Sequence, residues 1–251
     1  MFSFGNVKFR YDPYPIGLIK PVMDERLYGE LVDSYPPVEL FQFMPKFGNK
    51  YSLSEKFNAQ NYATYIKSHP RWRELHDWVK SREFIASVVA MLEHQHIDLG
   101  MRLDAHTFGR RLKVLRREIK RRRWPRTETP LSSRFEFSML PADGGYHRPH
   151  TDNPTKYITL VVSMVKEGEW NPAFGGGTDV LRTKHCEHSY NLVNNSLEFD
   201  DVERIDTFDF TPNQSVVFIK TFNSLHSVWP MTGKGSPAMR RTLTINIEAD
   251  L

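Results

Sequence analysis

Three side chains in the second half of the sequence could hold a metal ion. His150 and Asp152 are two residues apart, and on an extended strand such residues point to the same side. His226, which follows the apolar run 215–219, is the best candidate for a third ligand. Two imidazoles and one carboxylate on one face of an octahedron suit Fe(II) and leave the remaining positions open. His147 is the main competitor, but on an extended strand it would face away from His150, which favours a contact near the metal or with substrate.

An arginine follows the three candidate ligands in the sequence. Arg240 comes 14 residues after His226 and opens a strand-like, Thr-rich run. The planar fork of a guanidinium matches a carboxylate, so Arg240 could bind a carboxylate-bearing co-substrate. Arg241 is adjacent to it, and only one of the two can face the interior of a barrel. Thr242 would share the face of Arg240.

These residues belong to an ordered set of motifs. Gly-Gly-x-x-x-Pro-His-x-Asp occupies 144–152, Gly-Gly-x-Thr occupies 175–178, and His-x-Val-x-Pro occupies 226–230, before the late arginine. In this order they resemble the 2-oxoglutarate/Fe(II)-dependent oxygenases, and most of all the prolyl-hydroxylase-like branch. The resemblance covers about residues 134–249. One departure is that Leu140 and Pro141 replace the tyrosine that commonly precedes the Gly-Gly turn in that branch, which weakens any expectation of a prolyl substrate.

The resemblance implies a reaction and a set of site residues. It implies Fe(II) and 2-oxoglutarate as cofactors, ascorbate as an optional reductant, O2 as a partner, and hydroxylation of a C–H bond with succinate and CO2 as co-products. The metal ligands, which are also the catalytic residues, would be His150, Asp152 and His226, and the residues that bind 2-oxoglutarate would be Arg240, Thr159, Thr242 and Ser163. Residues that flank the mouth of the barrel in sequence, and so are candidates for substrate contact, are Arg134, His147, Arg148 and Trp229.

The elements that must position these residues fall into two parts. Residues 1–109 are expected to form a mostly helical support region. It would contain a short strand at 16–19, a helix from about Asp24, an irregular stretch at 37–55 and three helices within 56–96, one of them capped by Ser81. From Arg134 onward, period-two alternation and short β-rich runs at 156–165, 174–181, 205–210, 215–219 and 242–247 predict a sandwich or jelly roll. The resemblance narrows this to a mainly β fold, with a double-stranded β-helix (cupin-like) core at 134–249, in a single oxygenase domain at 1–251.

Charge and composition limit the partners. The chain has 251 residues, one cysteine (Cys186) and a net charge of +4, but residues 110–126 alone carry ten Lys or Arg against one Glu. That basic segment could attract nucleic acid or another anion, although the same run could be a solvated surface segment. The absence of a signal-like segment, of a membrane-length apolar run and of any cysteine pair predicts a cytoplasmic protein.

The sequence is compatible with three hypotheses of function. The favoured one is hydroxylation of a small-molecule or carbohydrate-type substrate, which could be anionic. The second is oxidative demethylation or hydroxylation of nucleic acid or of a protein side chain. The third is a non-catalytic, cupin-like metal-binding module. The sequence does not predict the oligomeric state.

Overall fold

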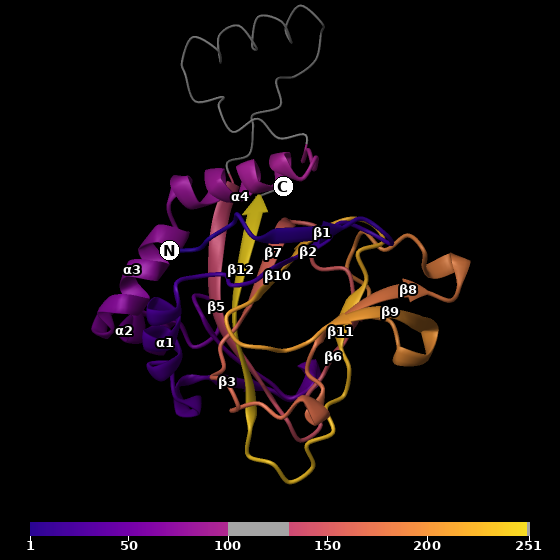
Figure 1. Ribbon diagram of the computed structural model, residues 1–251. Coiled ribbons are helices and arrows are strands. Elements are labelled where there is room, and N and C mark those ends of the chain that lie inside the picture. Colours follow the sequence, from indigo (N-terminus) through magenta and orange to yellow (C-terminus); the bar gives the residue numbers. More distant parts are fainter. Residues whose placement is uncertain (100–130, 250–251) are drawn as a thin grey trace, which may run out of the picture.

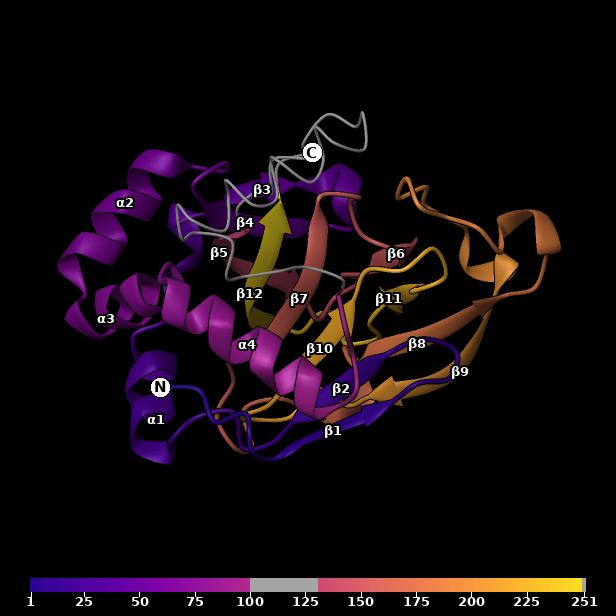
Figure 2. The same cartoon turned by 90° about the horizontal axis from the view of Figure 1, so that it is seen from above.

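The computed structural model describes residues 1–99 and 131–249, which form two antiparallel sheets. Within these residues the large sheet has eight strands, in the order β1 (Val7–Arg10), β2 (Ile16–Ile19), β10 (Ser215–Ile219), β7 (Lys156–Ser163), β12 (Met239–Ala249), β5 (Leu131–Pro141), β4 (Lys50–Ser54) and β3 (Gln42–Met44). The small sheet has four strands in the same described residues, in the order β6 (His147–His150), β11 (His226–Val228), β8 (Thr178–Thr183) and β9 (Val202–Phe208). The strands of both sheets are labelled in Figure 1, except β4, which is labelled in Figure 2.

The strand order is that of a jelly roll. From β5 onward the chain passes repeatedly between the sheets: β5, β7, β10 and β12 belong to the large sheet, and β6, β8, β9 and β11 to the small one. Strands that are distant in sequence therefore become neighbours, as in the pairs β12–β5 and β11–β6. This winding is the double-stranded β-helix predicted for residues 134–249, and the predicted fold class is confirmed.

Four helices in residues 1–99 cover one face of the large sheet. They are α1 (Glu25–Asp33), α2 (Ala59–Ser68), α3 (Pro70–Val79) and α4 (Arg82–His94). Figures 1 and 2 show them on the side of the large sheet away from the small sheet. The side chains of Asp24 and Ser81 accept hydrogen bonds from backbone N–H groups in the first turns of α1 and α4, which agrees with the helix starts predicted there.

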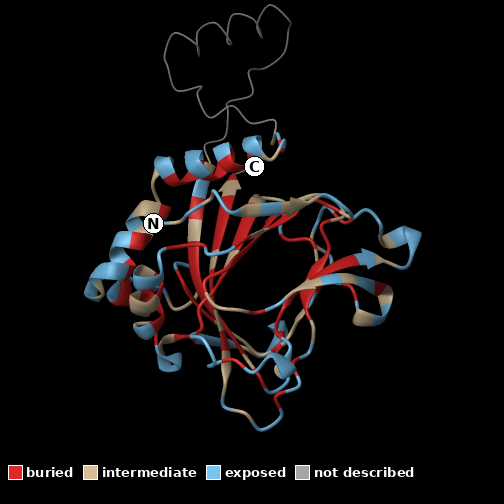
Figure 3. Ribbon diagram, viewed as in Figure 1, coloured by how far each residue is buried: buried red, intermediate tan, exposed pale blue. Residues whose placement is uncertain are grey.

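Period-two alternation divides the large sheet into an apolar and a polar face. On β5, Phe135, Phe137 and Met139 point to the helices, where Trp72 of α3 packs edge-on against Phe137 with ring centroids 4.7 Å apart. The inner strands of this sheet are largely buried (Figure 3), whereas the edge strands β1 and β3 contain no buried residue. The alternate residues, such as Glu136 and Ser138, are also buried but face the small sheet. The interior between the sheets is therefore lined with polar groups on β5, whereas Val161 of β7 and Val216 and Phe218 of β10 form an apolar cluster on the same face of the large sheet.

Several expectations about the first hundred residues need correction. Residues 37–55, expected to be irregular, contain β3 and β4, and β4 pairs with β5 at Ser52↔Ser138 and Ser54↔Glu136. Strand β1 was not expected either. Both additions extend the edges of the large sheet. Strands there form because their backbone groups bond to a neighbouring strand, and this pairing leaves no local pattern in the sequence.

Two predictions concern other parts of the chain. The basic segment 110–126 lies outside the described residues. Among the residues that the structure does describe, none of the helices has the length and apolar character needed to cross a membrane.

Candidate metal centre

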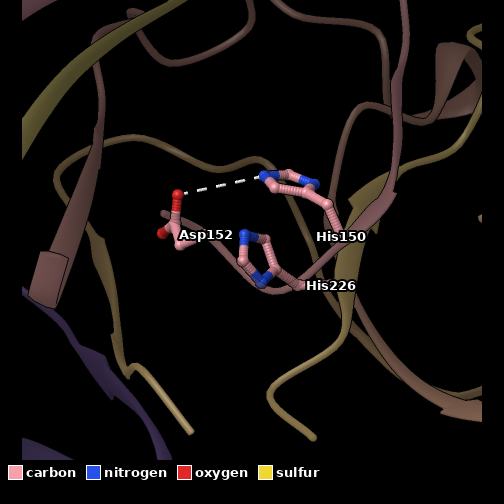
Figure 4. A group of neighbouring side chains, drawn as sticks. All are labelled: His150, Asp152 and His226. Carbon is pink, nitrogen blue, oxygen red and sulfur yellow. Dashed lines mark ion pairs between the residues drawn. The ribbon is translucent and has the colours of Figure 1, made fainter. Parts of the chain in front are cut away.

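His150, Asp152 and His226 come together in the structure. One ligand atom from each lies within 4.8 Å of the others, and this is the one group of its kind that the described residues contain. Figure 4 shows both imidazoles and the carboxylate directed toward one another. Nε2 of His150 lies 4.0 Å from Oδ1 of Asp152.

Strand pairing positions the two histidines, and a turn positions the aspartate. His150 on β6 and His226 on β11 are direct cross-strand partners, with ring centroids 4.4 Å apart. Strand β6 ends at His150, and Asp152 has a left-handed backbone with φ of 70°. The expectation that His150 and Asp152 share one face of an extended strand is therefore wrong. The chain turns after His150, and the turn brings the carboxylate back toward the imidazole.

Backbone carbonyls orient both imidazoles. Nδ1 of His150 lies 2.8 Å from the carbonyl oxygen of Arg148, and Nδ1 of His226 lies 2.9 Å from that of Ser224. A hydrogen bond from Nδ1–H to a carbonyl leaves Nε2 as the lone-pair nitrogen, which is the arrangement of metal-binding histidines.

The site keeps its ligands in the protonation states that a metal needs. Burial and the nearby His150 lower the pKa of His226 to about 3, and burial also lowers the pKa of His150, so both rings are neutral at neutral pH. Burial alone would raise the pKa of Asp152, but Lys156, His226 and His150 together hold it well below its ordinary value. Two neutral imidazoles and one ionised carboxylate fit a divalent ion such as Fe(II).

Two residues on β7 bind the carboxylate of Asp152. Nζ of Lys156 lies 2.5 Å from Oδ1, and the hydroxyl of Thr159 lies 2.9 Å from Oδ2. Thr159 was predicted to contact 2-oxoglutarate, and in the structure its hydroxyl contacts Asp152. Lys156 was not among the predicted site residues. A lysine at the start of a strand gives no signal of this contact, because the contact depends on the turn at 152–155.

His147 lies on the same side of the strand as His150, so the expectation that it faces away is wrong. The ring centroids of His147 and His150 are 6.0 Å apart. Strand pairing explains this, because His226 pairs with His150 but Val228 pairs with His147, which places a β-bulge in β6. Burial and the cation of Lys50 hold the pKa of His147 well below its ordinary value, so this ring too is neutral.

Arg240 is a buried cation on the inner face of β12. It is 5% exposed, its Nε donates to the carbonyl oxygen of Gly176, and its guanidinium carbon lies 4.8 Å from the ring centre of Phe210. In the described part of the chain no carboxylate forms an ion pair with it. Burial lowers its pKa to about 10, so it remains charged at neutral pH. Arg241 points to the helix-covered face, where it pairs with Glu169 and lies over the ring of Tyr35.

The close packing around Arg240 explains part of the glycine motif. Gly176 has φ of 85°, and a Cβ there would lie 3.1 Å from the sulfur of Met231 and 3.3 Å from Cδ of Arg240. Thr242 and Ser163 are buried cross-strand partners on the same inner face as Arg240, one alternate position further along β12. The predicted residues Arg240, Thr242 and Ser163 therefore form one group, whereas Thr159 lies with the metal ligands.

The remaining candidates for substrate contact are in three different environments. Arg134 lies on the inner face of β5, with Nε 3.3 Å from Oε1 of Glu248. Arg148 is on the surface and pairs with Glu198 at 2.5 Å. Trp229 packs against Phe199, with Arg204 stacked 5.0 Å from its ring centre, on the outer side of the small sheet. Only Arg134 and His147 of the predicted substrate residues therefore share the interior with the three ligands.

Comparison with known proteins gives structural matches alone. No protein-family model and no curated protein matches the chain. A Pseudomonas putida prolyl-4-hydroxylase is similar with a TM-score of 0.47 and 14% identity over 94% of this chain and 92% of that one. A Trichoplax adhaerens prolyl hydroxylase, solved with a peptide fragment of hypoxia inducible factor, has a TM-score of 0.46 and 12% identity over 93% and 83%.

A third solved structure is similar to the same extent. HygX from Streptomyces hygroscopicus, solved with nickel and 2-oxoglutarate, has a TM-score of 0.46 and 10% identity over 94% of this chain and 83% of that one. Because these TM-scores lie below 0.5, the class of fold rests on the strand order of this chain, and the metal site rests on its own three side chains.

Proposed function

We propose that this chain is an Fe(II)- and 2-oxoglutarate-dependent oxygenase that hydroxylates a C–H bond of a small polar molecule. The observation that supports this most is the convergence of His150, Asp152 and His226 within 4.8 Å. The buried guanidinium of Arg240, which forms no ion pair with a carboxylate of residues 1–99 and 131–249, adds a site for the far carboxylate of the co-substrate. When bound, Fe(II) and 2-oxoglutarate supply the oxidising chemistry, in which one oxygen atom of O2 enters the substrate and the other enters succinate, with release of CO2.

In this proposal, residues at one end of the barrel interior bind the metal and residues at the other end bind the co-substrate carboxylate. His150, Asp152 and His226 hold the metal through neutral imidazoles and an ionised carboxylate. Arg240 pairs with the co-substrate carboxylate, and the hydroxyls of Thr242 and Ser163 lie beside it for further hydrogen bonds. Phe210 and Trp170 pack next to Arg240 in a cluster that also contains Leu140 and Val228, which keeps water away from that end. In a dry environment the ion pair with Arg240 is stronger than it would be in water.

The inner face of the large sheet favours a substrate that forms hydrogen bonds. It carries two ion pairs, Lys50–Glu136 at 2.6 Å and Arg134–Glu248 at 3.3 Å. A polar substrate can form hydrogen bonds with the remaining donors and acceptors of these pairs, which an apolar substrate cannot do. A carbohydrate-type or similarly polar small molecule is therefore the class that we propose. No observation in the described residues favours nucleic acid over it.

The cofactors are tested by anaerobic titration of the metal-free protein with Fe(II) and 2-oxoglutarate. We expect the visible charge-transfer absorption of the iron–2-oxoglutarate chelate in the wild type and its loss in His150→Ala. Arg240→Met should weaken binding of 2-oxoglutarate on the order of 100-fold, because it removes charge-assisted hydrogen bonds.

Arg241→Met is the matched control. Its guanidinium lies on the opposite face of β12, so binding of 2-oxoglutarate should stay within about threefold of wild type, a difference below 1 kcal/mol. Folded wild-type protein that shows no chelate absorption would exclude the oxygenase proposal.

A further inference from the structure

The hydroxyl of Thr159 has two neighbours but one proton. It lies 2.9 Å from Oδ2 of Asp152 and 2.9 Å from the side-chain amide of Asn246, at the position of Oδ1. A hydroxyl donates one hydrogen bond, so it cannot donate to two oxygens at once. All three residues are buried, and Asn246 is 0% exposed, so water cannot relieve the conflict.

Two further buried polar atoms lack a hydrogen-bond partner on the same face of the sheet. Among the described residues, these are Nδ2 of Asn246 and Nε of Arg134, which lies 3.3 Å from Oε1 of Glu248 in an ion pair but donates no hydrogen bond to it. Asn246 on β12 and Arg134 on β5 are direct cross-strand partners. Directly opposed residues have Cβ atoms roughly 5 Å apart, so the Arg134 side chain is within reach of the Asn246 amide. A buried donor without a hydrogen bond costs about 1–3 kcal/mol, and two of them on adjacent residues point to a shared explanation.

One rotation of the Asn246 amide resolves all three conflicts. The oxygen and nitrogen of an amide have the same shape, so their hydrogen bonds decide which lies where. With the nitrogen toward Thr159 and the oxygen toward Arg134, each donor meets an acceptor. We infer that Arg134, Asn246 and Thr159 form a hydrogen-bonded chain that ends on the metal ligand Asp152 and fixes the orientation of its carboxylate.

Each residue of this hydrogen-bonded chain has its own role. Arg134 Nε–H donates to the Asn246 carbonyl, the Asn246 amide N–H donates to Thr159, and the Thr159 hydroxyl donates to Oδ2 of Asp152. Oδ1 of Asp152, which faces His150, is then the oxygen for the metal. Arg134 is also held by ion pairs, because this same Nε lies 3.3 Å from the carboxylate of Glu248 and Nη2 lies 4.0 Å from that of Glu136. Arg134, Asn246 and Thr159 are thus positioning residues, which deepens the proposed function and depends on its metal site.

Metal binding by Thr159 variants tests the end of the chain. We expect Thr159→Val, which keeps the shape and loses the hydroxyl, to weaken Mn(II) binding about 10- to 100-fold in titrations followed by electron paramagnetic resonance. Thr159→Ser keeps the hydroxyl and should stay within about threefold of wild type. The visible d–d bands of the Co(II)-substituted protein should shift in Thr159→Val and return in Thr159→Ser. Equal Mn(II) affinity in wild type and Thr159→Val, or no recovery in Thr159→Ser, would overturn the inference.

A double-mutant cycle tests whether Asn246 acts through Thr159. If Asn246 acts through the Thr159 hydroxyl, Asn246→Ala causes little further loss of Mn(II) affinity once that hydroxyl is gone. The double variant should therefore bind Mn(II) about as weakly as Thr159→Val alone. Multiplied effects of the two substitutions would show independent roles and contradict the chain. Thr244→Val, on the same inner face of β12, is the control and should leave Mn(II) affinity unchanged. Equal weakening in that variant would also overturn the chain.

These outcomes separate the inference from the proposed function. Wild-type protein that binds neither Mn(II) nor Co(II) would exclude the metal site itself, and both proposals with it. Wild-type protein that binds both ions, with variants that bind them equally well, would exclude the chain and leave the metal site intact.

Discussion

At the scale of single residues, the metal site contains a cation as well as its three ligands. Nζ of Lys156 lies 2.5 Å from Oδ1 of Asp152, the same oxygen that faces Nε2 of His150 at 4.0 Å. A divalent metal at this site would compete with the ammonium for one oxygen and would repel it. Lys156 therefore lowers the pKa of Asp152 and at the same time occupies an oxygen that the metal needs.

Removal of this ammonium should strengthen metal binding. We expect Lys156→Met to bind Mn(II) about tenfold more tightly than wild type, since one neighbouring charge at this range is worth about one pKa unit or more. Isothermal titration calorimetry measures the affinity directly, and the exposed Lys67→Met is the control. Weaker binding in Lys156→Met would mean that the lysine holds the carboxylate in place for the metal.

At the scale of elements, the helices stabilise the sheet from the face that carries no site residue. Trp72 of α3 is 0% exposed, packs edge-on against Phe137 and donates from Nε1 to the carbonyl oxygen of Ser34 at 2.6 Å. Arg134 and Glu136 of β5 lie on the opposite face of the large sheet, together with Thr159 of β7, which contacts Asp152. Period-two alternation thus places the apolar residues that pack against the helices on one face of the sheet and the polar residues that line the site on the other.

This separation predicts that stability and metal binding can be changed independently. Trp72→Ala should lower the free energy of unfolding by about 3–5 kcal/mol, measured by urea unfolding of the metal-free protein. The affinity of the folded fraction for Mn(II) should stay within about threefold of wild type. Phe47→Ala, which removes a ring that is 60% exposed, should change the free energy of unfolding by less than about 0.5 kcal/mol. Loss of metal affinity in Trp72→Ala would show that the two faces are coupled.

At the scale of the whole molecule, the interior of the barrel holds charges that are paired with one another. Glu136 is 3% exposed, yet it accepts hydrogen bonds from Lys50 at 2.6 Å and from Ser52 at 2.9 Å. Burial would raise its pKa, but Lys50, Arg134 and Ser52 outweigh that effect and lower the pKa to about 2. Strands β4 and β5, which are far apart in sequence, supply these charges.

The lowered pKa of Glu136 predicts how stability depends on pH. Because the folded pKa lies below the ordinary value of 4.5, Glu136 stabilises the fold above about pH 4.5, and this contribution is lost as the pH falls toward 2. Urea unfolding between pH 6 and pH 3 should therefore show a steeper loss of stability in wild type than in Glu136→Gln. The difference at pH 6 should be on the order of 3 kcal/mol. The exposed Glu39→Gln should follow the wild-type curve. Parallel curves for wild type and Glu136→Gln would contradict the prediction.

Residue patterns, together with the family resemblance that they carry, were enough to predict the fold class and the three candidate ligands. Alternation of Phe135, Phe137 and Met139 is a local pattern, so it can be read without knowing which strand pairs with which. The H-x-D pair, the later histidine and the late arginine are also short patterns, and their residue types already specify metal and carboxylate chemistry. The same local reasoning found the helix starts at Asp24 and Ser81.

How these residues face one another depends on the arrangement of strands and turns in three dimensions. The bulge in β6 turns His147 to the side of His150, and the turn after His150 directs Asp152 toward Lys156 and Thr159. The register between β12 and β5 places Asn246 opposite Arg134, and the winding of β12 directs Arg240 inward and Arg241 outward. The bulge, the register and the direction of Arg240 depend on pairing between strands up to about a hundred residues apart, for which a single sequence carries no local signal.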